Sequence, residues 1–482
     1  MQFDDFLDAI DGVIWGPYLL IPLLLGTGVI LTFRLKGVQL RSLIPALKLG
    51  LLKRKDDSGE GDISQYQALT TALAATVGTG NIIGVATAIS FGGPGAVFWM
   101  WVTGLFGMAS KYAEAFLGSK YREVDEKGEQ SGGPQVFLKR AIGGPLGKIL
   151  ATCFAIFGAF AAFGIGNMTQ ANSISVQLAN ATDGAVQGWM VGIVIMITTG
   201  LVLLGGITRI GKMTAGLVPL MIVLYIGGGI IVLVANAQNL LPAFQAIFVS
   251  AFTGSAALGG FAGAGVALAM RYGMARGIFS NESGMGSASI VAAAAQTSHP
   301  VRQGLVSMTQ TFIDTMIVVS FTALVILSSG GWYNEAKDDG SLNPGIFTQE
   351  AFQSTFLGGI GTWIVVISLV FFAYSTIIGW SYYGERCLVS LLGIKAQIPY
   401  RLLFTLVTFA GCVIELTTVW TIADILNGLM AIPNLIGLLA LSGLVAHETA
   451  AYLKKDPTLE LDNVEPFPLR QWTPGQGWKE IE

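Results

Sequence analysis

The sequence predicts an all-α protein that crosses a membrane about eleven times. Of its 482 residues, 52% are hydrophobic and 12% are charged, and the mean hydropathy is +0.64. Soluble domains carry about 25% charged residues, so most of this chain is expected to contact lipid or other helices. A membrane-spanning helix needs about 20 mostly apolar residues. Such stretches lie near residues 14–33, 66–90, 95–117, 147–179, 186–206, 213–235, 244–272, 303–329, 357–384, 401–420 and 423–449.

The basic residues predict the orientation of these spans. Cytoplasmic loops of membrane proteins are enriched in Lys and Arg, and every second predicted loop here is basic, with Lys337 as the exception in an outer loop. The N-terminus is therefore expected outside and the C-terminus inside, in the inner membrane of a prokaryotic cell. The acidic segment Met1–Asp11 does not resemble a cleavable signal peptide. The basic loops contain Arg34, Lys36, Arg41, Lys48, Lys53, Arg54 and Lys55, then Lys120, Arg122, Lys127, Lys139 and Arg140, then Arg209 and Lys212, Arg271 and Arg276, Arg386 and Lys395, and Lys454 and Lys455.

Composition and motifs argue against several other classes of protein. The net charge of -3 provides no basic field for nucleic acid. The three cysteines lie apart without CxxC spacing, and the two histidines cannot form a metal cluster by themselves. There is no HExxH motif and no GxxxxGK[ST] loop, so neither an enzyme nor an ATP-driven pump is expected, and no organic cofactor is predicted.

The chain divides into three predicted parts. Residues 1–60 form an N-terminal helix and a basic cytoplasmic loop, and residues 61–450 form a ten-helix transport core. Residues 451–482 form a cytoplasmic tail, and its part Asp462–Glu482, with Pro466, Pro468 and Pro474, is expected to be disordered.

Two predicted spans are interrupted by glycine. The second contains Val77-Gly-Thr-Gly-Asn81, and the seventh is glycine-rich over residues 252–265. Breaks in membrane helices are tolerated where the chain lines a protected cavity, and they often mark substrate sites. Since these two spans are five apart, they cross in opposite directions, which indicates a 5+5 inverted repeat. The alternative is that both glycine runs are only close-packing helix faces.

Several motifs resemble the alanine or glycine:cation symporter family. The stretch from Gly92 to Gly107, with its Trp-Met-Trp run and the Lys111-Tyr-Ala-Glu114 that follows, is similar to the family signature. The block from Gly277 to Ala288 also resembles the family, and the similarity extends from about residue 60 to 450. The resemblance implies the fold of the leucine transporter class with one extra N-terminal helix. It further implies alternating-access symport of a small neutral amino acid with Na⁺.

The resemblance also implies a site. The break resembles the unwound first core helix of sodium-coupled leucine transporters, which have Leu where this chain has Thr79. By that likeness, the Thr79 and Gly80 amides would face the substrate carboxylate, and the Asn81 side chain would lie near substrate or ion. The sodium ligands implied are the carbonyls of Ala74, Val77 and Phe372 and the hydroxyls of Ser375 and Thr376.

The residues themselves supply further candidates for the substrate pocket. Gln170 is an acceptor for the substrate ammonium or an interhelical hydrogen bond, and Trp380 is a pocket wall or a packing aromatic. No carboxylate lies within either glycine-rich break, so neutral acceptors are expected for the ammonium. Small residues at the breaks predict a small pocket for alanine, glycine or serine. The remaining candidates are Gly260 and Gly263 in the second break and Phe163 and Phe261 as lids.

Acidic residues within the spans leave two further alternatives. Asp314 is either a proton-coupling site, which would make the protein a proton-coupled amino-acid symporter, or a partner for neighbouring hydroxyls. Glu114 and Glu282, with Arg271 or Arg276, form either an inner-gate ion-pair network or ordinary interfacial groups. A channel is disfavoured because the chain has no repeated filter motif. The sequence leaves the oligomeric state open, and a monomer is compatible with this plan.

Overall fold

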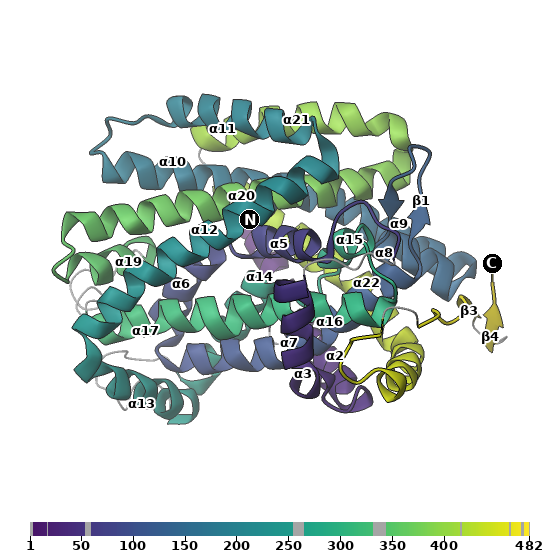
Figure 1. The fold of residues 1–482 in the computed structure, drawn as a ribbon. Helices are drawn as coiled ribbons and strands as arrows, with labels where there is room; N and C mark the ends of the chain where they lie inside the picture. Colours follow the sequence, from purple (N-terminus) through teal and green to yellow (C-terminus); the bar gives the residue numbers. More distant parts are fainter. Residues whose placement is uncertain are drawn as a thin grey trace.

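The computed structural model describes residues 3–16, 18–53, 59–253, 265–330, 344–414, 417–461, 464–473 and 477–481. The long helices run side by side, and the short strands gather at one end of the bundle, close to the C-terminus (Figure 1). Both sheets are two-stranded antiparallel hairpins. We refer to the end of the bundle that carries these hairpins as the tail face.

The helices of the first half begin with α1 (Phe3–Ile14), α2 (Leu20–Arg34), α3 (Val38–Arg41), α4 (Leu43–Leu47) and the π-helix η1 (Lys48–Lys53). There follow α5 (Gln65–Thr76), the 3-10 turn η2 (Thr79–Asn81), α6 (Ile83–Gly92), α7 (Gly95–Lys120), the hairpin β1 (Glu123–Val124) and β2 (Gln130–Ser131), α8 (Pro134–Phe137) and the π-helix η3 (Leu138–Ile142). The half continues through α9 (Gly144–Phe163), the π-helix η4 (Gly164–Met168), α10 (Thr169–Ala181), α11 (Gly188–Leu203) and α12 (Gly206–Ala235).

The second half begins with α13 (Ala237–Thr253), α14 (Val266–Asn281) and α15 (Ala288–Ala293), followed by α16 (Pro300–Thr311), the π-helix η6 (Phe312–Val319) and α17 (Ser320–Ser329). Next come α19 (Pro344–Gln353), α20 (Gly359–Leu392), the 3-10 turn η7 (Ile394–Ala396), α21 (Gln397–Val413) and α22 (Thr417–Lys455). The hairpin β3 (Arg470–Thr473) and β4 (Gly477–Glu480) closes the chain.

Hydrophobic length supports a membrane-spanning bundle. Within the described residues, six helical stretches are long and apolar enough to cross a membrane. They are Gly144–Ala181, Gly206–Ala235, Pro300–Ser329, Gly359–Leu392, Ile394–Val413 and Thr418–Lys455. Shorter apolar helices occur at Leu20–Arg34, Ile83–Gly92 and Gly188–Leu203. The count of eleven spans and the inverted repeat stay predictions.

Small residues let the helices pack closely. Helix α7 packs against α6, α14, α15 and α16, and α20 packs with α9, α10 and α21. At Gly277 of α14, an added Cβ would collide with the hydroxyl of Thr103 on α7. At Gly379 of α20, it would lie 2.8 Å from the Cβ of Ala75 on α5. Glycine at these crossings therefore brings backbones together, as is common in membrane helices.

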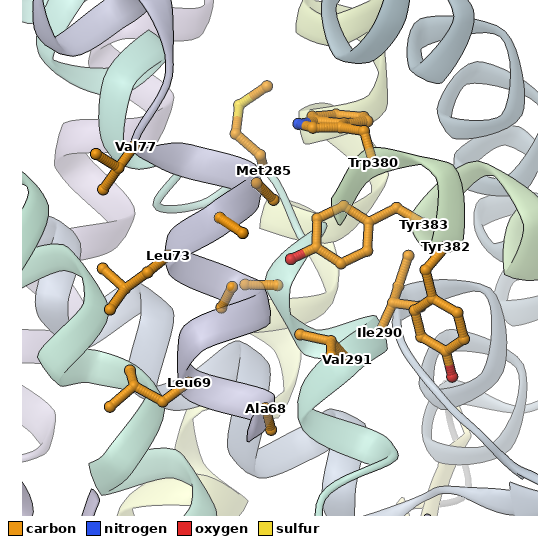
Figure 2. Packing of buried hydrophobic residues seen from close by; sticks show 14 of the residues in the cluster. Ala68, Leu69, Leu73, Val77, Met285, Ile290, Val291, Trp380, Tyr382 and Tyr383 are labelled. Carbon is orange, nitrogen blue, oxygen red and sulfur yellow. The ribbon is translucent and has the colours of Figure 1, made fainter. Parts of the chain in front are cut away.

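Helix α5 connects these two groups of helices. It begins with a capping box, in which Ser64 Oγ accepts from the Gln67 amide and Gln67 Oε1 accepts from the Ser64 amide. Its side chains Leu69 and Leu73 point to one side of the helix, while Tyr383 of α20 lies on the other (Figure 2). The middle of the bundle is thus a dry, packed core built around α5.

The first predicted break is present, because helix α5 ends at Thr76 and α6 begins at Ile83. The predicted second break, residues 252–265, lies mostly outside the described residues, between the end of α13 at Thr253 and the start of α14 at Val266, and stays a prediction. A further break, which the sequence analysis did not predict, lies at 282–287, between α14 and α15, and faces the first break. Its backbone turns through left-handed conformations at Glu282 (φ 53), Gly284 (φ 91) and Gly286 (φ 86), which ends α14.

The prediction of a disordered tail is wrong for the part that the structure describes. Helix α22 extends to Lys455. The C-terminal tail, by which we mean the described residues 456–461, 464–473 and 477–481, contacts the tail face. Lys120 Nζ donates to the carbonyls of Phe467 and Pro468 at 3.0 and 3.2 Å, and Arg302 Nη1 donates to that of Leu461 at 2.9 Å. Basic side chains at the helix ends therefore provide the donors that order a proline-rich segment.

Candidate substrate and sodium site

A small cavity lies where the two backbone breaks face each other. It contains about 280 Å³ of space not filled by protein atoms, part of which is open to solvent. A ligand with few heavy atoms is therefore the best fit. Its walls are formed by Ala75, Thr76, Gly78, Thr79, Gly80, Ile165, Gln170, Phe279, Glu282, Thr376 and Trp380.

The first break presents backbone amides to this cavity. The Gly78 amide donates to Asn81 Oδ1 at 3.0 Å, so the Asn81 side chain holds the turn in shape. The Thr79 amide lies 3.4 Å from Gln170 Oε1, which is a long hydrogen bond. This amide can therefore turn to an anionic ligand at little cost. Freed amides at a helix break are a common anchor for a carboxylate.

Four oxygen atoms from α5 and α20 converge beside the cavity. Ser375 Oγ lies 3.1 Å from the Ala74 carbonyl oxygen and 2.8 Å from that of Phe372. Thr376 Oγ1 lies 3.0 and 3.1 Å from the same two oxygens. All four residues are buried. A hard cation such as Na⁺ prefers oxygen ligands, so this donor set fits it.

The Val77 carbonyl, predicted to join this oxygen cluster, is not tied to it by any hydrogen bond of the described residues. Val77 ends α5 as its C-cap, and its amide donates to the Leu73 carbonyl at 2.7 Å. The oxygen cluster still adjoins the first break, because a Cβ at Gly78 would lie 2.6 Å from Thr376 Oγ1.

A buried carboxylate forms part of the cavity wall. Trp380 Nε1 donates to Glu282 Oε1 at 2.8 Å, and Ser287 Oγ donates to Glu282 Oε2 at 2.6 Å. Lys111 Nζ donates to the backbone carbonyl of Glu282 at 3.1 Å. The expectation that only neutral acceptors surround the substrate is therefore wrong, because the chain that breaks α14 brings a carboxylate to the site.

A second buried carboxylate lies behind the first break. Asp314, on the π-helix η6, accepts from Asn81 Nδ2 at 2.7 Å through Oδ1. Its Oδ2 accepts from Ser280 Oγ at 3.0 Å and from Thr315 Oγ1 at 2.9 Å. Asp314 thus has the hydroxyl partners that the sequence suggested, together with an amide from the break itself.

The whole site lies within a region that matches one protein family. The sodium:alanine symporter family matches residues 1–465. The chain belongs to the sodium:alanine symporter family. Membership makes the protein a multi-pass, sodium-coupled amino-acid symporter and not an enzyme.

Curated relatives of this symporter extend over nearly the same length. The sodium/alanine symporter AgcS of Methanococcus maripaludis is 52% identical, with 94% of this chain and 98% of AgcS covered. The putative sodium/proton-dependent alanine carrier protein YrbD of Bacillus subtilis is 36% identical over 91% of this chain and 90% of that protein. The probable sodium/glutamine symporter GlnT of the same organism is 36% identical over 92% and 91%.

The fold has a solved counterpart. The crystal structure of MhsT in complex with L-phenylalanine superposes with a TM-score of 0.57 at 16% identity. The match covers 81% of this chain and 99% of that one. At this identity the likeness concerns the fold, and it agrees with the predicted leucine-transporter class.

Some predicted site residues of the symporter lie elsewhere or are not described. Phe163 is not in the cavity wall; its ring packs against those of Tyr400 and Phe404, with centroids 5.2 and 5.6 Å away. The chain changes from α-helix to π-helix directly after Phe163, which turns this side chain toward α21. Gly260, Phe261 and Gly263 lie outside the described residues.

The predicted pairing of Glu282 with Arg271 or Arg276 is also wrong. Glu114 Oε1 accepts from the Gly286 amide at 3.0 Å and from Asn434 Nδ2 at 2.8 Å, so it supports the second break. Arg271 and Arg276 line a different cavity, together with Asp11 and Asp424 among other residues.

Sequence reasoning missed six residues of the cavity wall: Ala75, Thr76, Gly78, Ile165, Phe279 and Glu282. The polar run Asn281-Glu-Ser-Gly-Met-Gly-Ser287 was a usable signal for the second break, because it contains two glycines and a carboxylate in an otherwise apolar region.

Proposed function

We propose that this symporter takes up a small neutral amino acid, such as alanine or glycine, together with Na⁺ across the inner membrane by alternating access. The observation that carries the proposal is the convergence of Ala74, Phe372, Ser375 and Thr376 oxygens directly beside the cavity at the first break. An ion bound there would fix the break and so order the amides that receive the substrate carboxylate. The names of the alanine-transporting relatives support the same substrate class.

The size of the cavity supports a small side chain. Phe279 and Trp380 form aromatic walls, and Ile165 adds an apolar one. Thr79, Gly80 and Gln170 supply the polar part of the site, with Asn81 behind them as the residue that shapes the turn. Alanine, glycine and serine suit this balance better than leucine does.

Alternating access requires two parts that move against each other. The cavity takes Thr79 and Glu282 from the two breaks and Phe279 from α14. It takes Gln170, Thr376 and Trp380 from the group of α10 and α20. In the proposed inverted repeat, α5 and α6 correspond to α14 and α15. We place the tail face in the cytoplasm, because Lys120, Arg122, Lys139, Arg140 and Arg302 gather there.

The first experiment is radiolabelled alanine uptake into proteoliposomes that contain the purified protein, driven by a sodium gradient or by an equal potassium gradient. Accumulation only with sodium is expected. Thr376→Val removes one oxygen ligand at constant shape, and it should raise the half-saturating Na⁺ concentration roughly tenfold or more.

The matched control is Ser381→Ala, on the same helix. Its hydroxyl donates to the Ile378 carbonyl at 2.6 Å, away from the oxygen cluster. It should leave the Na⁺ dependence unchanged. Equal Na⁺ affinity in Thr376→Val and the natural protein would remove the sodium site from the proposal.

A proton-coupled symporter is the second candidate, favoured by the buried Asp314 that bonds Asn81 of the first break. A proton bound to Asp314 would act on the first break through Asn81, which is the segment that the proposed sodium ion would also order. Uptake that rises at low pH without sodium, and that is lost in Asp314→Asn, would establish this alternative. Sodium-driven uptake that survives in Asp314→Asn would rule out this alternative and leave sodium coupling as the mechanism.

A further inference from the structure

Glu282 is the only charged residue in the cavity wall that the structure describes. Its side chain is buried, with 5% of the residue exposed, and its backbone has φ 53. A non-glycine residue in this left-handed region is uncommon, and such conformations cluster at functional sites. Glycine would adopt this conformation more readily, so the carboxylate occupies the position at a conformational cost.

The hydrogen bonds that this carboxylate accepts bring no positive charge to it. Both donors, Trp380 Nε1 and Ser287 Oγ, are neutral. Lys111, the nearby buried ammonium, donates to the backbone carbonyl of Glu282. Each carboxylate oxygen accepts one of these bonds and can accept a second. The side chain is thus held in place with free acceptor capacity.

The surrounding charges favour a cationic ligand. The buried groups around the breaks are Lys111, Glu114, Glu282 and Asp314, that is, three carboxylates and one ammonium. A buried charge that lacks a partner is costly. One Na⁺ at the oxygen cluster offsets part of the imbalance, and a positive group in the cavity offsets more.

We infer that Glu282 binds the protonated amino group of the substrate. This inference rests on the proposed function and refines it. The amides of Thr79 and Gly80 take the carboxylate at one end of the cavity, and Glu282 takes the ammonium at the other. The substrate class is then a zwitterion with a primary ammonium, and a 2-hydroxy acid of the same size, such as lactate, is excluded.

A comparison of alanine with lactate tests the natural protein first. Alanine should raise the unfolding temperature of the purified protein in sodium and should be accumulated, whereas lactate should do neither and should not compete. No substitution is needed, so no folding defect can obscure the result. Competition by lactate as strong as that by unlabelled alanine would overturn the inference.

The variant Glu282→Gln keeps the shape and the Trp380 bond but removes the charge. The KM for alanine should rise roughly ten- to a hundredfold, while the sodium-induced rise in unfolding temperature persists because the oxygen cluster is untouched. Ser289→Ala is the control: its hydroxyl donates to the Gly286 carbonyl at 2.6 Å in the neighbouring α15. It should keep the natural KM.

The possible results distinguish the role of Glu282 from the proposed function. Accumulation of alanine by the natural protein with an unchanged KM in Glu282→Gln would overturn the role of Glu282 alone. A natural protein that neither binds nor accumulates alanine would overturn the proposed function, and this inference with it.

Discussion

Arg386 Nη1 lies 2.7 Å from Asp125 Oδ2, which ties the end of α20 to the loop of the β1–β2 hairpin. The same guanidinium also pairs with Glu129 and stacks 5.1 Å from the ring of Tyr382. The hairpin follows α7, so this cluster joins the two groups of helices that enclose the cavity. The ion pairs of Arg386 with Asp125 and Glu129 therefore join the helix groups at the tail face, and they do not include Glu114 or Glu282.

Loss of the Arg386 charge should therefore lower the free energy of unfolding much more than loss of one of its acidic partners. Arg386→Gln leaves Asp125 and Glu129 close together without a cation, at a cost of about 3–5 kcal/mol in the free energy of unfolding. Asp125→Asn leaves Glu129 as the partner and should cost about 1 kcal/mol. Thermal unfolding in detergent measures both, and equal losses would contradict the argument.

A glycine series tests the close approach at the first break. Gly78→Ala should abolish sodium-driven uptake, because the new Cβ would lie 2.6 Å from Thr376 Oγ1 and push that hydroxyl away from Ala74. Gly84→Ala, in α6, meets nothing within 4 Å. It should retain uptake and stabilise the helix by up to about 1 kcal/mol. Uptake at matched protein levels decides between them.

His299 should make stability depend on pH. It is the N-cap of α16, where Nδ1 accepts from the Val301 amide at 3.1 Å. Burial lowers the pKa of His299 from 6.5 to about 4. Between about pH 4 and pH 6.5, the unfolded chain therefore binds a proton at His299 while the folded chain does not. Stability is full above pH 6.5 and falls as the pH drops toward 4, by up to about 3 kcal/mol.

The variant His299→Asn isolates this effect. Asparagine is a good N-cap residue and does not titrate, so the decline of the unfolding temperature between pH 6.5 and pH 4.5 should become shallower. An unchanged pH profile would show that other groups cause the decline.

The C-terminal tail should stabilise the tail face. Removal of residues 462–482 deletes the carbonyls that accept from Lys120 and leaves a buried ammonium with Glu448, 3.0 Å away, as its remaining partner. We expect a loss of about 2 kcal/mol or more. Removal of residues 477–482 alone, the exposed β4 strand, should have little effect. Thermal unfolding of the two truncated proteins measures the difference.

Sequence reasoning located features that are local in the chain. The first break consists of consecutive residues, Val77 to Asn81. Two glycines and an asparagine inside an apolar span are enough to predict it. The proximity of Ser375 and Thr376 to Ala74 came from family resemblance and could not come from spacing, because three hundred residues separate them.

The features that were missed depend on contacts between distant segments. The chain at 282–287 turns because Glu114 and Lys111 of α7 bond its backbone, and composition does not reveal those contacts. The proline-rich tail has a disordered composition, and its order comes from Lys120 and Arg302, more than 150 residues away. Composition indicates the conformation that a segment adopts by itself, whereas the conformation of these segments depends on contacts with distant residues.

The C-terminal tail also joins parts of the chain that are far apart in the sequence. Tyr121 donates to the Arg470 carbonyl, and Lys120 donates to that of Phe467. The end of α7 is thereby held by the segment that follows α22, so the tail couples helices from the two halves of the chain.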